Sequence, residues 1–153
     1  MYKRQYHKWV DDGLLQLRPG IKLLIYNALK RKIQLAISTS TSLMNVETLF
    51  KKCFEIKPDL IFKVIATGDM VKRKKPDPEL YLLALNQLSL QPEECIALED
   101  SNNGLTSAKR AKLKTICSPS KYHIDDNFEE ADFICDDFTK DKLPSELRQL
   151  IYN

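Results

Sequence analysis

The sequence has little that suits a membrane, a secretory signal or a nucleic-acid surface. No apolar run approaches the roughly 18 residues that cross a bilayer. The basic start, residues 1–5, leads into polar and aromatic residues and not into the apolar segment of a secretory signal. The net charge is only +3, and the aromatic residues do not alternate with basic ones as a base-stacking surface requires. We therefore expect neither a membrane nor a nucleic acid as a partner.

Cysteine and histidine are also sparse, with four and two residues. The four cysteines are Cys53, Cys95, Cys117 and Cys135, with no CxxC pair among them. Three lie in or beside apolar runs, which favours buried reduced thiols over a zinc site or disulfides. Reduced thiols indicate a cytoplasmic protein. His7 and His123 are isolated in sequence, so a surface or packing role is favoured over metal binding.

What the chain does contain is an alternation of helical and strand-like segments within 153 residues, enough for one domain with a real core. Helical spacing of apolar residues occurs at 3–13, 21–29, around 46–50, 79–88 and 102–112. Strand-like runs lie at 33–37, 62–66, 96–98, 115–117 and 133–135. This alternation predicts an α/β fold of the Rossmann-like kind, with a parallel sheet flanked by helices.

Three polar groups follow predicted strands, so the sequence places them along one rim of that sheet. Thr39 and Ser40 follow the first strand, a segment leading to Lys75 follows the second, and Glu99 and Asp100 follow the third. Hydroxyls, a lysine and paired acids are together the composition of a phosphate-and-metal site.

Each group also has a simpler interpretation. Thr39 and Ser40 can hold phosphoryl oxygens, but hydroxyls after a strand often cap a helix. The basic run 72–75 is typical of a solvated loop, although Pro76 fixes the backbone directly after Lys75. Glu99 and Asp100 are hard oxygen ligands suited to Mg²⁺, but such acids also cap helices or form an ion pair with a lysine.

The order of these groups adds specificity. Residues 35–40 (Leu-Ala-Ile-Ser-Thr-Ser), 75–78 (Lys-Pro-Asp-Pro, preceded by Gly-Asp at 68–69) and 97–101 (Ala-Leu-Glu-Asp-Ser) resemble motifs II, III and IV of the haloacid dehalogenase (HAD) superfamily. Within it, the closest likeness is to the CbbY-like sugar-phosphate phosphatases. Supporting segments lie at 17–21, 41–50, 118–122 and 136–137, so the resemblance extends over nearly everything from about residue 9 onward.

The resemblance implies a Mg²⁺-dependent phosphatase (a hydrolase) that acts on a small sugar phosphate, such as xylulose bisphosphate, through an aspartyl-phosphate. By the same resemblance, Thr39 hydrogen-bonds the phosphoryl group beside Ser40, and Lys75 neutralises its charge. Asp100 and Glu99 hold the magnesium ion. Thr39 and Lys75 are thus the expected catalytic residues of this chain.

One family motif has no counterpart. Members of the superfamily carry DxDGT at the end of an N-terminal strand, where it supplies the nucleophile. Here the nearest match, Asp11-Asp12-Gly13, lacks the intervening residue and has no apolar strand before it. We therefore expect residues 1–17 to be a remnant of the helical cap and hinge, and residues 18–153 to be a HAD-like core lacking its first strand. The chain alone is then expected to be inactive, with the missing N-terminal segment as its partner.

Two alternatives stay open at this point. A β-phosphoglucomutase-like mutase uses the same core, and the residues that separate it from a phosphatase lie in the cap. A non-catalytic module that binds phosphate and metal would need only the rim residues.

Overall fold

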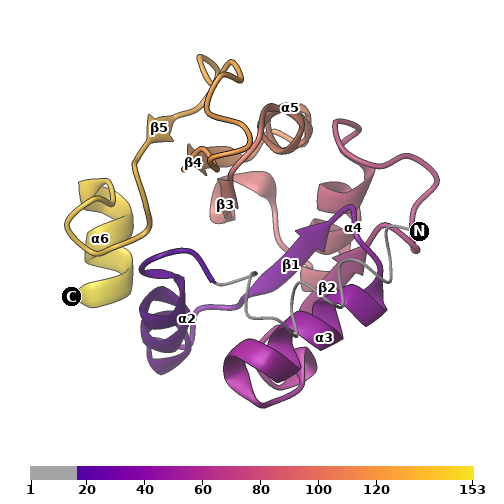
Figure 1. Cartoon of the computed structure of the whole chain (residues 1–153), viewed down its shortest axis with the longest axis horizontal. Coiled ribbons are helices and arrows are strands. Elements are labelled where there is room, and N and C mark those ends of the chain that lie inside the picture. The colour runs from indigo at the N-terminus through magenta and orange to yellow at the C-terminus, as the bar shows by residue number, and fades with distance from the viewer. Residues whose placement is uncertain (1–16) are drawn as a thin grey trace.

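The computed structural model describes residues 17–153, in which helices and short strands alternate (Figure 1). The strands are β1 (Ala36–Thr39), β2 (Val64–Thr67), β3 (Ile96–Glu99), β4 (Lys114–Cys117) and β5 (Phe133–Ile134). The helices are α2 (Ile21–Lys30), α3 (Leu43–Phe54), α4 (Glu79–Leu88), α5 (Asn102–Arg110) and α6 (Ser145–Tyr152), with 3-10 turns η1 (Pro58–Leu60) and η2 (Pro92–Glu94). The predicted α/β fold with parallel strands and flanking helices is confirmed.

The strands of residues 17–153 form two separate sheets. β1 pairs with β2, and β3, β4 and β5 pair in that order, all in parallel. Within residues 17–153, β1 and β3 each pair on one side only. Figure 1 shows them as neighbours, β1 in indigo-purple and β3 in salmon, with no strand of the described chain between them. The sheet therefore has a break in its middle.

Backbone groups at this break follow from the alternation along each strand. The Leu35 carbonyl accepts from Lys63 N–H on the β2 side, so the groups of Ala36 and Ser38 point to the other side of β1. The Glu99 carbonyl accepts from Ser118 N–H, which follows β4, so the groups of Leu98 point away from β4. Within residues 17–153, no strand pairs with either edge, and the Ser38 carbonyl on this side accepts from the side chain of Lys75.

Apolar side chains cover both faces of the strands. On one face α4 packs on the β1–β2 sheet through Leu80, Ala84 and Leu88. On the other face α3 packs beneath β1 through Val46 and Phe50. A third cluster joins α2 and α6 to β4, and half-buried side chains on both sides of the break pack against it: Leu35 before β1, and Ile96 and Leu98 in β3. The core is therefore continuous beneath the break.

One local feature differs from the sequence prediction. Helix α6 was not predicted, although Leu147 and Ile151 are buried in its core-facing stripe. Helix α4 begins at Glu79, as predicted, with Pro78 as its N-cap. Asp77 accepts from Glu79 N–H, at 3.1 Å.

Some predictions concern residues that the structure does not describe. The predicted helix at 3–13 and nearly all of the predicted cap remnant at 1–17 lie outside residues 17–153. Among the described residues, none of the helices has the length and apolar character needed to span a bilayer.

Candidate functional site

The turns that follow β1 and β2 are held against each other at one rim. Gly68 N–H donates to the Thr41 carbonyl at 2.8 Å. A Cβ at Gly68 would lie 2.2 Å from the Ser40 carbonyl oxygen, so only glycine permits this approach. The close contact places the Thr39–Ser40 turn beside the start of the segment that leads to Lys75.

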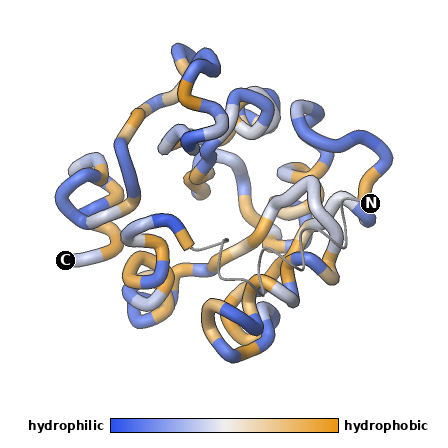
Figure 2. Tube along the Cα trace, viewed as in Figure 1, coloured by the Kyte–Doolittle hydropathy of each residue, from blue (hydrophilic) through white to orange (hydrophobic). Residues whose placement is uncertain are grey.

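Lys75 leaves the basic loop and is buried at the break. Its Nζ donates to the Ser38 carbonyl of β1 at 2.8 Å and to Glu99 Oε1 of β3 at 2.5 Å. The side chain is only 11% exposed, whereas Arg73 is 74% exposed and pairs with Asp77. The loop between β2 and α4 is largely blue in Figure 2, as a solvated basic run requires. The solvated-loop interpretation therefore fits Arg73 but is wrong for Lys75.

Glu99 is the acceptor on which two donors converge. Its Oε1 accepts from Lys75 Nζ and from the hydroxyl of Tyr81 on α4. Glu99 and Tyr81 are 8% and 9% exposed. Burial, reinforced by the negative charge of Glu99, raises the pKa of Tyr81 well above its usual value. The hydroxyl thus stays protonated and donates to the carboxylate.

Asp100 follows Glu99 directly but differs from it in its contacts. No hydrogen bond or ion pair from residues 17–153 occupies its carboxylate, which is half-buried. The cap of α5 is Ser101, whose Oγ accepts from Gly104 N–H at 3.2 Å, so the capping role considered for Asp100 belongs to Ser101. Within residues 17–153, the Glu99 carboxylate is therefore hydrogen-bonded, and the Asp100 carboxylate is not.

The fit to a magnesium ion follows from these contacts. Asp100 offers the hard oxygen that Mg²⁺ prefers, and Glu99 Oε1 is held by a lysine and a tyrosine. Nowhere in residues 17–153 do three or more His, Cys, Asp or Glu side chains gather as a metal site requires. The described residues are thus compatible with Mg²⁺ but supply only part of its ligands.

The hydroxyl groups at the end of β1 are not used to cap α3. Thr39 Oγ1 accepts from Thr41 N–H at 3.3 Å, within the turn. The N-cap of α3 is Ser42, which makes no side-chain cap bond. Ser40 is half-buried in the same turn. Helix capping therefore does not account for Thr39, and no acceptor within residues 17–153 takes its hydroxyl proton.

The supporting segments seen in the sequence also meet in space. Arg18 donates to the Ser118 carbonyl at 2.7 Å and to its hydroxyl at 2.5 Å, and Ser118 Oγ donates to the Asp136 carbonyl at 2.9 Å. The chain before α2 is thus tied to the loops that follow β4 and β5. These contacts join three loops and do not involve Lys75 or Glu99.

Sequence reasoning did not identify Tyr81 as a site residue. The signal was nevertheless present, because Tyr81 shares the buried face of α4 with Ala84, Leu85 and Leu88. A tyrosine on such a face needs a hydrogen-bond partner for its hydroxyl, and a buried polar partner was therefore implied.

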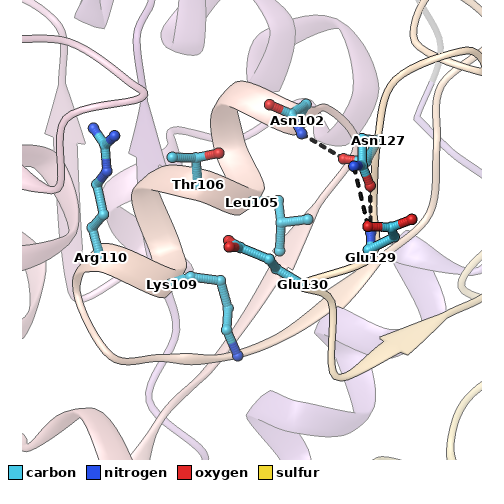
Figure 3. A pocket seen from close by; sticks show the side chains of 8 residues that line it. All are labelled: Asn102, Leu105, Thr106, Lys109, Arg110, Asn127, Glu129 and Glu130. Carbon is cyan, nitrogen blue, oxygen red and sulfur yellow. Dashed lines mark hydrogen bonds between the residues drawn. The ribbon is translucent and has the colours of Figure 1, made fainter.

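A depression lies beside α5 and is separate from the rim site (Figure 3). Its lining side chains carry mixed charge: Asn102, Leu105, Thr106, Lys109, Arg110, Asn127, Glu129 and Glu130. Lys109 is already paired with Asp132, and Arg110 donates to the Pro76 carbonyl. No predicted site residue lines this depression, so it does not compete with the rim as the candidate site.

Comparisons with known proteins show which family this chain resembles. Residues 1–118 match the family model described as Haloacid dehalogenase-like hydrolase. The chain is 49% identical over 129 residues to Protein CbbY of Cereibacter sphaeroides. The matched region covers 84% of this chain and 56% of that protein. It is 34% identical over 118 residues to a Phosphorylated carbohydrates phosphatase of Thermotoga maritima. This match covers 75% of this chain and 53% of that protein.

Solved structures show the same likeness. A crystal structure of a CbbY mutant from Rhodobacter sphaeroides in complex with Xylulose-(1,5)bisphosphate matches with a TM-score of 0.83 and 45% identity. The match covers 90% of this chain and 63% of that chain. The present chain therefore spans between half and two thirds of the length of these similar proteins.

Proposed function

The chain belongs to the haloacid dehalogenase-like hydrolase family, and from this premise we propose that it is the C-terminal part of a Mg²⁺-dependent phosphatase that hydrolyses a small sugar phosphate. Xylulose bisphosphate is the proposed substrate, because it is the compound bound by the similar CbbY mutant. The proposed reaction passes through an aspartyl-phosphate, with the nucleophilic aspartate outside this chain.

The observation that carries the proposal is the position of Lys75 at the break between β1 and β3. Its ammonium touches the open edge of β1 through the Ser38 carbonyl and touches β3 through Glu99. A strand inserted at this break would meet the outward-facing backbone groups of Leu98 on one side and the Ser38 N–H on the other, with the Ser38 carbonyl shared with Lys75. A carboxylate at the end of that strand would lie beside the ammonium of Lys75.

The rim residues then have distinct tasks in phosphoryl transfer, which depends on positioning and charge stabilisation. The ammonium of Lys75 offsets negative charge on the transferring group and orients the nucleophile. The Thr39 hydroxyl donates to a phosphoryl oxygen, and Ser40 lines the same turn. Asp100, with Glu99, contributes oxygen ligands to Mg²⁺, and the inserted strand contributes others. When bound, the ion supplies Lewis-acid stabilisation of the phosphoryl oxygens.

The test measures release of inorganic phosphate from xylulose bisphosphate in the presence of Mg²⁺. We expect no turnover by this chain alone, and turnover once a family-type N-terminal segment ending in DxDGT is added. Lys75→Ala and Asp100→Asn in the completed enzyme should each lower kcat by about 100-fold or more, the usual scale for losing one charge-stabilising group. Lys114→Ala is the matched control, since this lysine is 46% exposed and pairs at the surface.

Four results would contradict parts of the proposal. Turnover by this chain without the added N-terminal segment would show that the chain contains its own nucleophile. Full activity of Asp100→Asn would refute its role at the metal. Phosphate exchange between sugar positions without net release would instead identify a mutase. Binding of phosphate without either reaction, even after the segment is supplied, would identify a non-catalytic module.

A further inference from the structure

Tyr81 lies three residues after the motif at 75–78, yet it contacts the two central rim residues, Lys75 and Glu99. We propose that its hydroxyl is a positioning group that fixes Glu99, and through Glu99 holds the Lys75 ammonium at the open edge of β1. The inference rests on the proposed function for its catalytic meaning, but its geometry stands on this chain alone.

Three contacts define the cluster formed by Tyr81, Glu99 and Lys75. The Tyr81 hydroxyl and Lys75 Nζ both donate to Glu99 Oε1. The same ammonium lies 4.6 Å from the centroid of the Tyr81 ring, which is cation–π range. Tyr81 therefore touches the lysine with its ring and the counter-ion of that lysine with its hydroxyl. A phenylalanine would keep the first contact and lose the second.

Glu99 is confined from the opposite side by helix α5. A Cβ built on Gly104 would lie 1.9 Å from Glu99 Oε2, so the carboxylate occupies the space of a missing side chain. Tyr81 on α4 and Gly104 on α5 thus form two walls around one carboxylate. Without the hydroxyl, Glu99 keeps one donor in place of two, and its rotamer is less restricted.

Fixing Glu99 matters because a lysine side chain is otherwise flexible. Lys75 carries a point charge on a four-carbon stem, and its use at a rim depends on where acceptors hold it. Here one acceptor is the Ser38 carbonyl, which the backbone of β1 fixes, and the other is the Glu99 carboxylate. The direction of the ammonium therefore depends on the side chain that Tyr81 restrains.

The experiment observes the ammonium group directly by NMR in the chain labelled with ¹⁵N-lysine, with Lys75→Met to assign the signal. In the unsubstituted chain we expect a slowly exchanging Lys75 ammonium, shifted to low frequency by the Tyr81 ring. Tyr81→Phe should speed its exchange with water by about tenfold, the change expected for the loss of one hydrogen bond to a charged group. Gly104→Ala should have the same effect with the tyrosine intact.

Matched variants separate positioning from a general loss of stability. Tyr122→Phe changes a tyrosine that is 82% exposed, and Asn103→Ala changes the exposed neighbour of Gly104 on α5. Neither should alter the Lys75 signal. The ammonium of Lys109, which pairs with Asp132 at 2.8 Å, should keep its signal in all variants. A purely structural role for Tyr81 would lower the melting temperature and leave the Lys75 exchange rate unchanged.

An unchanged Lys75 exchange rate in folded Tyr81→Phe would overturn the proposal, as would a fast-exchanging Lys75 ammonium in the unsubstituted chain. If Tyr81→Phe does not fold, the hydroxyl proton of Tyr81 decides the matter in the unsubstituted chain. A protected hydroxyl signal close to the Lys75 ammonium supports the proposal, and its rapid exchange refutes it. None of these readouts uses phosphatase activity, so failure here is distinct from failure of the proposed function.

Discussion

The two strands that border the break, β1 and β3, are less buried than the strands paired with them, β2 and β4. In β2 and β4, three of four residues are buried, whereas all four residues of β1 are only half-buried. β3 alternates between half-buried and buried positions. β1 has this exposure although helices cover both of its faces. The difference indicates that its solvent contact comes from the open edge and not from a missing helix.

The halves also differ in the chemistry that they bring to the rim. The β1–β2 half contributes hydroxyls and the buried lysine, and the β3–β4–β5 half contributes carboxylates. Lys75 and Glu99 join them at 2.5 Å, with side chains that are 11% and 7% exposed. A buried ion pair is stable only when both charges keep their partners. Among the ion pairs given for residues 17–153, the one that joins the two halves is Lys75–Glu99, and loss of either partner leaves a buried charge without its counter-ion.

The largest effect expected is that of removing this link. Lys75→Met leaves Glu99 buried without a counter-ion, and we expect the free energy of unfolding to fall by about 4 kcal/mol. Urea denaturation followed by circular dichroism measures the change. A loss below about 1 kcal/mol, no more than a surface pair gives, would show that the halves do not depend on the pair.

A smaller effect is expected from a cavity within one half. Leu80 of α4 is fully buried against the β1–β2 sheet, so Leu80→Ala should cost about 3 kcal/mol. Amide exchange should accelerate more in β2 than in β4, because the break weakens transmission between the halves. Ile116→Ala in β4 is the matched reverse experiment. Equal acceleration in both sheets would mean that the break does not divide the molecule.

A pH-dependent contribution is expected inside the β3–β4–β5 half. Burial alone raises the pKa of Asp132, but the hydrogen bonds from Lys109 and from Thr115 N–H outweigh it and lower the pKa below its usual value. The resulting stabilisation is present above the ordinary carboxyl pKa of about 4 and is lost as the pH falls through the lowered value. Because Asp132 is partly exposed, Asp132→Asn should cost below about 1 kcal/mol at pH 7.

Comparison of melting curves at pH 7 and pH 3 checks this prediction. The difference between Asp132→Asn and the unsubstituted chain should shrink at the lower pH. A difference that grows on acidification would give the linkage the opposite sign and exclude the proposed contacts.

The smallest effect is expected for an ion pair that stays within one half at the surface. Lys114 of β4 pairs with Glu146 of α6, and their side chains are 46% and 70% exposed. Lys114→Met should change the free energy of unfolding by about 0.5 kcal/mol or less, because solvent screens the pair. Urea denaturation of Lys114→Met and Lys75→Met under the same conditions compares the free energies of unfolding of the two variants directly. A similar loss in both variants would remove the special status of the pair at the break.

Much of the fold follows from local sequence pattern. Helix α4 was predicted at 79–88 and is found at those residues, because its apolar spacing and the preceding Pro78 are both local signals. The predicted strand runs lie within three residues of the observed ends. Helix α6 was missed because its short stripe becomes recognisable only when it packs on α2 and β4. Strand pairing, and with it the division into two sheets, is not encoded by local periodicity. Only the family resemblance, through its missing first strand, pointed to an incomplete sheet.

The site was predictable in composition but not in its internal contacts. Strand ends placed Thr39, Lys75 and Asp100 near one rim because parallel strands share an edge. The sequence did not separate Glu99 from Asp100, since two adjacent acids look alike until the fold directs one of them toward Lys75 and Tyr81. Tyr81 was hidden for the same reason, because its partner comes from a strand on the other side of the break.

Site-resolved hydrogen exchange tests the open edges of β1 and β3 most directly. We expect rapid exchange at the amides of Ser38 and Leu98, and slow exchange at that of Ile37, which faces β2. Adding the N-terminal segment should protect Ser38 and Leu98 while leaving Ile37 unchanged. Equal protection of all three amides in the chain alone would mean that the edges are already paired, and would contradict the account.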